Sequence, residues 1–489
     1  MDQKRPAQVS GGFGGSAGSR AIDAYESILA KSPNSPNSWF NLAIAYRQAG
    51  RPLDALTAYD ESLSRGLKDP EEAEVQKAVI LSEDLARPHD AHATLIRALS
   101  LNAYYVPALL NLGNLHEDLG EWMEAESAYR RAFDVDEGNN LALSRLIAVG
   151  RHESPEAPRL KEAEARLQAP QTSLPDRADL GFALGSALDA LGVYDRAFAA
   201  YSHANRASAE LARREGVSYD RRAHEQLIDR IIQVFSSDME RAPDDQDEPP
   251  IFICGMVRSG STLIESILAR HDAICAGGEL SIIPSLAATA LQPYPESVGF
   301  CTRSDFAEMA RMYRRAASTH SRNGMRLTDK RPDNFLHVGL IKQIFPGAKI
   351  IRTVRNPLDN GVSAFFLHAS QHLPYATDLA DIAHFLAQER RLMAFWKRRY
   401  PGDILDVDYD AFVIDPAPIA ANILTFLELP SQTGLLVSSQ NDGPIRTASH
   451  RQVRRPIYRD SSGRAVRYAP FIDLLKGALQ TFGVESLAE

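Results

Sequence analysis

The residues with the clearest chemistry follow a short apolar run, Ile251-Phe-Ile-Cys254. They form a glycine-rich segment, Gly255-Met-Val-Arg258-Ser-Gly260-Ser-Thr262, which leads into the periodic apolar positions of Leu263 to Leu268. This order predicts a buried strand, a loop and a helix. Such a loop directs backbone N–H groups and a helix N-terminus at an anion. We therefore expect a phosphate-type site whose residues are Arg258, Ser259, Gly260, Ser261 and Thr262.

This loop differs from that of a nucleoside triphosphatase. Ser261 follows the GxxxxG pattern, where a Walker loop has lysine, and the cation of the segment is Arg258, inside the loop. The strand expected at 348–354 ends in Arg355, whereas a magnesium-binding strand would end in Asp. These features disfavour a P-loop kinase, an alternative that predicts magnesium-dependent ATP binding. We expect no metal site, because no CxxC or Cys/His pair is formed by the three cysteines, Cys254, Cys275 and Cys301.

Further residues suit a second anion and a proton acceptor. Arg355, at a strand end, and Ser363, eight residues later, can together grip a second phosphate. Glu279 follows two glycines at the edge expected for a cleft, where a carboxylate can serve as general base. The rival bases are His271, His337 and His368. The first cradle suits a 5′-phosphosulfate, and the Arg355/Ser363 pair suits a 3′-phosphate.

Strands must position these groups, and apolar runs predict them at 251–254, 348–354 and 404–409. Residues 251–489 carry 27 Lys and Arg against 23 Asp and Glu, a net charge of +4. Since the whole chain has a net charge of −9, the first 250 residues have a net charge of −13. The mildly basic half is where we expect an anionic ligand, although +4 is too weak a charge to indicate nucleic acid. A polar, proline-flanked stretch, Arg241 to Pro250, separates the two halves.

The N-terminal half shows a helical repeat. Small residues recur at Ala21, Ala55, Ala91, Ala125 and Ala197, with separations of 34, 36, 34 and 72 residues, the last being twice 36. Four positions after each lies a large side chain, in order Tyr25, Tyr59, Leu95, Tyr129 and Tyr201. Small residues let two antiparallel helices approach closely, while large ones fill the groove between neighbouring pairs. The pattern resembles the tetratricopeptide repeat over about residues 20–210, and such arrays present a concave surface to a peptide or another domain.

The region from about 249 to 480 resembles the sulfotransferases that use 3′-phosphoadenosine 5′-phosphosulfate (PAPS), in particular protein-tyrosine sulfotransferases. The family's Arg-Ser-Gly-Thr-Thr loop is matched by Arg258 to Thr262, and its Gly-Glu-Glu segment by Gly277 to Glu279. The resemblance implies a P-loop-like α/β domain with a central parallel sheet. It also implies that Lys330 neutralises the leaving oxygen. Other residues that it implicates are Arg258 and Ser449 for the sulfuryl group, Arg355 and Ser363 for the 3′-phosphate, and Tyr409 and Arg464 near the nucleotide.

Besides Ser261, a conservative change in the loop, and Arg331, which intervenes between Lys330 and the family's Pro, the sequence departs from that family at four positions. Gly278 replaces a Glu, Ser281 and Ser285 stand where tyrosine sulfotransferases have peptide-binding arginines, and Leu367 replaces a further Arg. The cofactor and reaction class therefore carry over better than the acceptor, which could be a protein tyrosine or the hydroxyl of a sugar, lipid or small molecule.

Taken together, these patterns predict a PAPS-dependent sulfotransferase with Glu279 as general base. The alternative is a protein that is not an enzyme, an interaction scaffold with an inactive nucleotide domain. We expect a disordered tail at 1–19, tetratricopeptide repeats at 20–216, a connecting helix and linker at 217–248, and a sulfotransferase domain at 249–489. The acceptor is expected to dock on the repeats. Since no signal sequence or membrane-length apolar run is evident, we expect a cytoplasmic protein.

Overall fold

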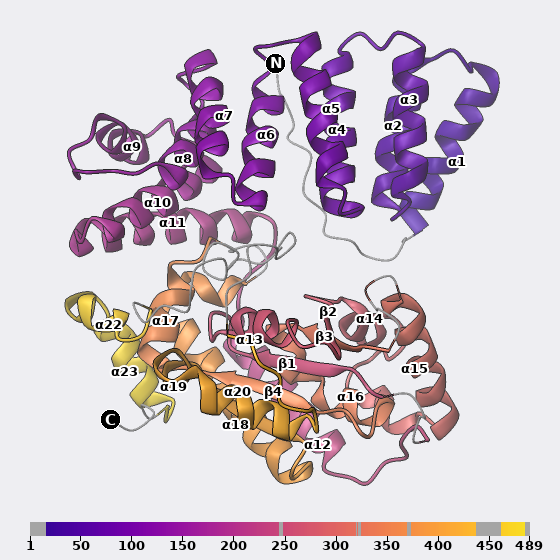
Figure 1. Cartoon of the computed structure of the whole chain (residues 1–489), viewed down its shortest axis with the longest axis vertical. Helices are drawn as coiled ribbons and strands as arrows, with labels where there is room; N and C mark the ends of the chain where they lie inside the picture. The colour runs from indigo at the N-terminus through magenta and orange to yellow at the C-terminus, as the bar shows by residue number, and fades with distance from the viewer. Residues whose placement is uncertain are drawn as a thin grey trace. The chain divides into compact units, whose positions relative to one another are not determined.

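The structure, a computed structural model, describes residues 16–243, 248–318, 320, 324–368, 373–436 and 461–484 (Figure 1). By its internal contacts the chain forms two compact units, Met1–Arg151 and His152–Glu489. Within the described ranges, no helix combines the length and the apolar composition needed to cross a bilayer.

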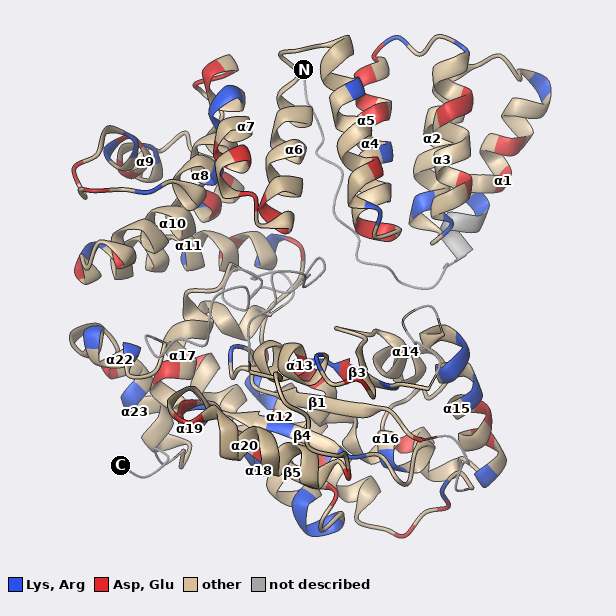
Figure 2. Ribbon diagram, viewed as in Figure 1, with Lys and Arg blue, Asp and Glu red and all other residues tan. Residues whose placement is uncertain are grey.

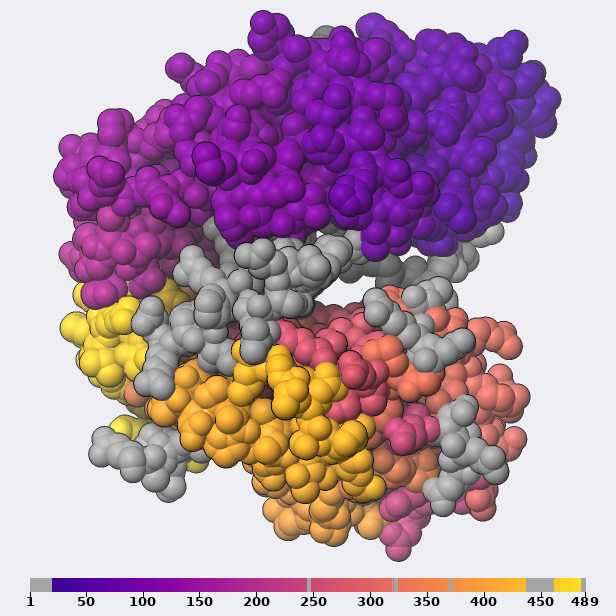
Figure 3. Space-filling view, viewed as in Figure 1, coloured from indigo at the N-terminus to yellow at the C-terminus, as the bar shows by residue number. Residues whose placement is uncertain are grey.

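The first unit is built from antiparallel helix pairs (Figure 1). Its α-helices are α1 (Ser16–Lys31), α2 (Pro36–Gln48), α3 (Pro52–Ser64), α4 (Pro70–Val79), α5 (Pro88–Leu101), α6 (Val106–Leu119), α7 (Trp122–Val135) and α8 (Asn140–Val149). Their side chains form a continuous surface in the space-filling view (Figure 3). Acidic residues lie on α3 to α5 (Figure 2), in keeping with the negative charge of the first half of the chain.

Small and large residues interlock in these pairs as the repeat pattern predicts. Ala55 and Ala125 are fully buried, as is Tyr129. A Cβ atom at Gly113 of α6 would lie 2.3 Å from Cε1 of Tyr129 on α7. The absence of a side chain at Gly113 therefore permits the close approach of the two helices.

The second unit begins with helices of the same kind, α9 (Pro158–Gln168), α10 (Leu174–Ala190) and α11 (Tyr194–Arg214), followed by α12 (Arg221–Phe235). Gly185 of α10 faces Tyr201 of α11 as Gly113 faces Tyr129, because a Cβ atom there would lie 2.8 Å from the tyrosine ring. The α11 helix also contacts α17 (Pro357–Phe365), where Asn205 Nδ2 donates to the carbonyl oxygen of Phe365 across 2.7 Å. This helix pair is therefore part of the unit that contains the sheet.

The sheet has five parallel strands in the order β2-β3-β1-β4-β5. They are β1 (Ile251–Gly255), β2 (Ile274–Ala276), β3 (Arg326–Lys330), β4 (Ile350–Val354) and β5 (Ile404–Asp408). Helices connect them, as crossovers between parallel strands require, and pack on both faces. The predicted fold class, a helical repeat region followed by an α/β domain with a central parallel sheet, is confirmed.

Alternate residues of β1 contact opposite layers of the second unit. Ile251 and Ile253 lie in a core cluster with residues of α13 and α20, whereas the Phe252 ring contacts those of Tyr313 and Phe345. The remaining α-helices are α13 (Ser261–Leu268), α14 (Ile282–Thr289), α15 (Arg303–Ala317), α16 (Val338–Ile344), α18 (Leu379–Arg399), α19 (Tyr409–Ile414), α20 (Pro416–Phe426), α22 (Arg464–Arg467) and α23 (Asp473–Thr481). The carboxyl ends of all five strands meet at one edge of the sheet, where ligands of such folds bind.

Candidate active site

The loop between β1 and α13 is closed tightly by two glycines. Gly255 has φ +138°, and a Cβ atom there would lie 2.4 Å from the carbonyl oxygen of Thr353 in β4. Gly260 has φ +103°, and its Cβ would lie 2.4 Å from the Tyr409 ring. The positive φ angles favour glycine at both positions, and the packing leaves no space for a side chain. The backbone thereby turns directly into the N-terminus of α13.

Ser259 holds this loop against the sheet. Its side chain is buried, and its Oγ donates to the carbonyl oxygen of Met256 across 2.6 Å. The Oγ of Ser259 also lies 2.6 Å from Oγ1 of Thr353. Ser261 and Thr262 are buried in the first turn of α13. Of the predicted loop residues, Ser259 thus has a visible role in shaping the cradle.

The structure brings Arg258 and Ser363 together beside this loop. Arg258 Nε donates to Ser363 Oγ across 3.2 Å, and Arg355 Nη1 donates to the carbonyl oxygen of Arg258 across 3.0 Å. The guanidinium carbon of Arg355 lies 4.9 Å from the centre of the Tyr409 ring, a cation–π distance. Four residues predicted from separate segments of the sequence therefore form one cluster.

The described hydrogen-bond acceptors of Arg355 are neutral, so its positive charge is available to an anion. Its side chain is buried, and it donates to two backbone carbonyl oxygens, those of Arg258 and Ser461. Within the described residues, its buried Nε has no hydrogen-bond partner. Carbonyl oxygens satisfy N–H groups without neutralising a full charge, so a buried guanidinium held this way favours an anionic ligand.

Glu279 and Lys330 form a second cluster at the same edge. Lys330 Nζ donates to Glu279 Oε1 across 2.5 Å. Lys330 ends β3 and is fully buried, whereas the side chain of Glu279, which follows β2, is 43% exposed. Since β3 lies beside β1, Lys330 reaches the edge next to the glycine-rich loop. The general base and the leaving-group cation predicted from the sequence are thus direct partners.

Glu265, a buried carboxylate on α13, was not predicted from the sequence. Its Oε1 accepts from the Gly278 N–H across 3.0 Å and from Thr328 Oγ1 across 2.7 Å. Burial raises the pKa of Glu265, and the nearby Lys330 charge opposes that rise. A single charged residue among the apolar positions of a short helix was the signal that could have indicated it.

A further predicted residue, Arg464, pairs outside these two clusters. Arg464 pairs with Asp189 of α10 across 2.7 Å, and its guanidinium carbon lies 5.0 Å from the centre of the Phe366 ring. Its charge is therefore directed at a repeat helix. Ser449 lies outside the described residues. Ser281 and Ser285 lie at the N-terminal end of α14, close in sequence to Glu279.

The three rival histidines have structural surroundings. His271 is buried, and its two ring nitrogens lie within hydrogen-bond distance of backbone groups of Pro430 and Ala273. His337 is buried too, and burial lowers its pKa to about 4. His368 stacks on Phe182 with ring centres 4.6 Å apart. In the part of the chain that the structure describes, no group of three His, Cys, Asp or Glu side chains is placed to hold a metal.

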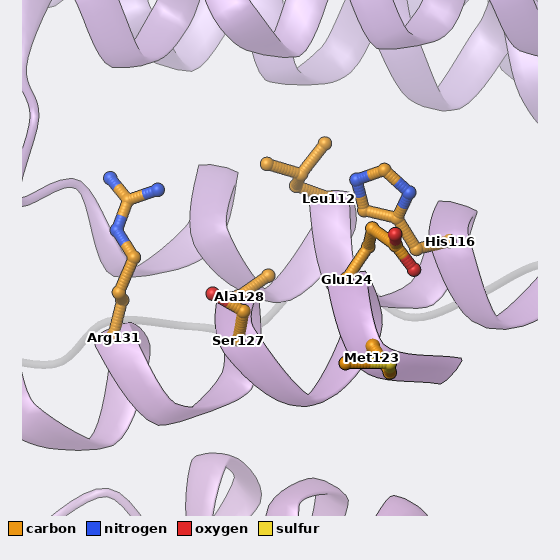
Figure 4. Close-up of a pocket in the computed structure, with 7 residues that line it drawn as sticks. All are labelled: Leu112, His116, Met123, Glu124, Ser127, Ala128 and Arg131. Atoms are coloured by element: carbon orange, nitrogen blue, oxygen red, sulfur yellow. The ribbon is translucent and has the colours of Figure 1, made fainter. Parts of the chain in front are cut away.

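The first unit has a separate pocket of about 380 Å³ between α6 and α7. The close-up shows Arg131 at one end and His116 with Glu124 at the other (Figure 4). The remaining lining residues are Leu112, Met123, Ser127 and Ala128. The pocket is thus lined by charged side chains of both signs and by the apolar side chains of Leu112, Met123 and Ala128.

The fold and the edge of the sheet define a phosphate-loop α/β domain with a paired carboxylate and lysine. Residues 249–433 match the model of a sulfotransferase family, and residues 24–57 and 108–141 match models of the tetratricopeptide repeat. The chain therefore contains a sulfotransferase-family domain together with tetratricopeptide repeats, which confirms the two resemblances at the level of the family.

Individual relatives cover parts of the chain. A protein of Aquifex aeolicus is 34% identical over 64% of this chain and 43% of its own length. A protein-tyrosine sulfotransferase of Drosophila melanogaster is 23% identical over 49% of this chain and 52% of its own length. The sulfotransferase domain of the Synechococcus PCC 7002 olefin synthase is 20% identical, with a TM-score of 0.37 over 51% of this chain and 99% of that domain. The match spans less than two thirds of each of these two full-length relatives.

Proposed function

We propose that the protein transfers a sulfuryl group from PAPS to an acceptor hydroxyl. The observation that carries this proposal is the presence of two clusters at one sheet edge: Arg258, Arg355 and Ser363 beside the loop, and Lys330 with Glu279 at the end of the adjacent strand β3. The first cluster suits a ligand with two separate anionic groups, and the second suits proton removal and charge neutralisation.

The chain's own residues fit such a nucleotide. The loop N–H groups, the α13 N-terminus and Arg258 would hold the 5′-phosphosulfate. Arg355 and Ser363 would hold the 3′-phosphate. Among the described residues the Nε of Arg355 has no partner, which supports this role because it leaves a buried donor for the ligand. Tyr409, which already packs on Gly260 and Arg355, would form a wall of the site.

When bound, PAPS supplies the sulfuryl group. Glu279 takes the proton of the acceptor hydroxyl while the acceptor oxygen bonds to sulfur. The bond between sulfur and the bridging phosphate oxygen breaks, and Lys330 stabilises the electron pair that this oxygen keeps. Lys330 would exchange its bond with Glu279 for one to the bridging oxygen, which frees the carboxylate for the acceptor. The proposed roles of Ser449 and Arg464 near the sulfuryl group and nucleotide rest on the resemblance alone.

Incubation with sulfur-labelled PAPS and a phenol tests the proposal. We expect labelled aryl sulfate and adenosine 3′,5′-bisphosphate in equal amounts, without added magnesium. A thermal shift should show stabilisation by the bisphosphate, as linkage requires for a ligand of the folded state. Larger stabilisation by ATP with magnesium, together with no transfer to any hydroxyl, would contradict the proposal and favour a kinase or an inactive scaffold.

For the acceptor, we propose a protein tyrosine, and the name of the Drosophila relative supports this choice. The carbohydrate or small-molecule hydroxyl remains the second candidate, because Ser281 and Ser285 replace the arginines expected to bind an acidic peptide. The repeats would hold the acceptor protein, with the pocket of Arg131 and Glu124 as the docking point. Mass spectrometry of a sulfated cell extract distinguishes these acceptors. We expect the docking of the acceptor and its sulfation to take place in the cytoplasm. Localisation of a tagged chain would test this.

A further inference from the structure

The turn that carries Glu279, residues 277–279, is held by hydrogen bonds on several sides. The Gly277 N–H donates to the carbonyl oxygen of Thr328 across 3.1 Å, and the Lys330 N–H donates to that of Gly278 across 2.9 Å. Both bonds join the turn to β3. The Gly278 N–H instead donates to a side chain, Oε1 of Glu265, across 3.0 Å.

Gly278 needs this outside acceptor because the turn departs from the strand. Its φ is +68°, in the left-handed region, so the chain no longer follows the regular ladder between β2 and β3. A Cβ atom at Gly277 would lie 2.3 Å from the Thr328 carbonyl oxygen, so the turn is packed closely onto β3. A backbone N–H enclosed here would be costly to leave unpaired.

Glu265 is itself fixed. Its side chain is 6% exposed, and its Oε1 accepts a second bond from Thr328 Oγ1 across 2.7 Å. Among the described residues it forms no ion pair, and the Lys330 charge acts on it from a longer distance. Burying a carboxylate without an ion pair is unfavourable, so its hydrogen bonds to the turn and to β3 must offset part of that cost.

We propose that Glu265 is a positioning residue for proton transfer: by holding the Gly278 N–H, it fixes Glu279 against Lys330. This inference rests on the proposed function of Glu279 as the base. Glu265 lies on α13, whose N-terminus is at the phosphate loop. One eight-residue helix therefore sets both the anion cradle and, one turn later, the place of the base. The distance between the proposed sulfuryl donor in the cradle and the base Glu279 is thereby fixed by a single rigid helix.

The test compares Glu265→Ala, which removes the acceptor, with Glu265→Gln, whose amide oxygen can accept from both donors. Ser266→Ala is the matched control on the same helix, because Ser266 Oγ donates to Leu263 and not to the turn. We expect kcat of Glu265→Ala to fall about 10- to 100-fold, the loss that follows a small misplacement of a catalytic group. Its Kd for adenosine 3′,5′-bisphosphate and its acceptor KM should change less than about threefold, since the misplaced base acts on the transition state. Glu265→Gln should recover most of kcat, and Ser266→Ala should match the wild type.

Hydrogen exchange gives a readout that needs no activity. The exchange rate of the Gly278 amide is followed in a peptide spanning residues 274–280. This rate should be faster in the Glu265→Ala variant than in the wild type, and unchanged in the Glu265→Gln variant. If the alanine variant does not fold, Glu265→Asp replaces it, because a carboxylate one methylene shorter keeps the charge and loses the reach. Unchanged exchange, unchanged kcat, or a glutamine variant as impaired as the alanine variant would overturn the inference. A wild type that transfers no sulfuryl group would contradict the proposed function instead, while the exchange result would still report on the hydrogen bond.

Discussion

Lys330 and Glu279 are joined by a hydrogen bond of 2.5 Å between Nζ and Oε1, yet they differ sharply in exposure. The lysine side chain is fully buried at the end of β3, whereas the glutamate side chain is 43% exposed. A buried cation is held in place by its surroundings, while an exposed carboxylate is accessible to an acceptor. The pair therefore orders the two proposed roles in space, with Lys330 in the interior and Glu279 towards solvent.

Glu279→Gln should remove the base and preserve the shape of the site. We expect kcat to fall by about 10² to 10⁴, the usual contribution of a general base, with bisphosphate affinity near wild type. A more acidic phenol needs less help with its proton, so the variant should recover part of its rate on that substrate. Steady-state kinetics with two phenols of different acidity provide the measurement. Equal losses on both phenols, accompanied by a lower Tm, would indicate a structural role for Glu279.

Arg355→Ala should weaken binding of adenosine 3′,5′-bisphosphate. The expected loss is about 1.5 to 3 kcal/mol, the worth of a charge-assisted hydrogen bond, or roughly 10- to 150-fold in Kd. Titration calorimetry without magnesium measures it. Arg391→Ala is the control, since Arg391 is an exposed arginine of α18 that pairs with Asp229. An unchanged Kd in the Arg355 variant would remove this residue from the proposed 3′-phosphate site.

Gly260→Ala should disrupt the loop. The new Cβ would lie 2.4 Å from the Tyr409 ring on a backbone of φ +103°, so either the ring or the loop must move. We expect a loss of more than about 1 kcal/mol in stability and much weaker bisphosphate binding. Gly477→Ala in α23 is the matched control, because its Cβ would meet nothing within 4 Å and alanine favours a helix. Thermal unfolding and a bisphosphate titration of both variants make the comparison. Wild-type affinity in Gly260→Ala would show that the loop tolerates a side chain.

Local patterns were sufficient to predict three of the five strands, β1, β4 and β5, and the glycine-rich loop with the helix that follows it. The apolar run, the glycines and the apolar-periodic helix are consecutive in sequence, and the interval between Arg355 and Ser363 reflects a strand end followed by two helical turns. The strand predicted at 404–409 ends at Asp408, and Tyr409 begins α19 instead. Since short-range spacing determines such features, a single sequence reveals them.

Contacts between distant segments could not be predicted in this way. Glu265 meets Thr328 only because α13 packs beside β3, and no spacing in the sequence records that packing. The pairing of Arg464 with Asp189 likewise joins α22 to α10, and Asn205 joins α11 to α17. Tertiary packing decides these pairs, so the attachment of the last helix pair to the sheet unit became evident only from the structure.

The stability of the second unit should depend on His337 in mild acid. Burial lowers the pKa of His337 to about 4, from an ordinary value near 6.5, with Arg331 acting in the same direction and Asp333 opposing it. The folded state therefore resists protonation that the unfolded chain accepts. This contribution is complete above pH 6.5 and is lost progressively as the pH falls from about 6.5 to about 4. A difference of about 2.5 pKa units corresponds to about 3 kcal/mol.

His337→Gln should remove this dependence, because glutamine stays neutral throughout. Urea unfolding at pH 7, 6, 5 and 4, followed by the fluorescence of Trp396, provides the measurement. Trp396 is buried, and its Nε1 donates to the carbonyl oxygen of Phe335, close in sequence to His337. Because Trp39 and Trp122 of the first unit also emit, the measurement compares the wild type with the variant. His224, whose pKa burial also lowers to about 4, acts equally in both proteins and cancels. We expect the wild type to lose about 3 kcal/mol more than the variant between pH 7 and pH 4. Parallel curves for the two proteins would mean that His337 accepts a proton in the folded state as readily as in the unfolded chain.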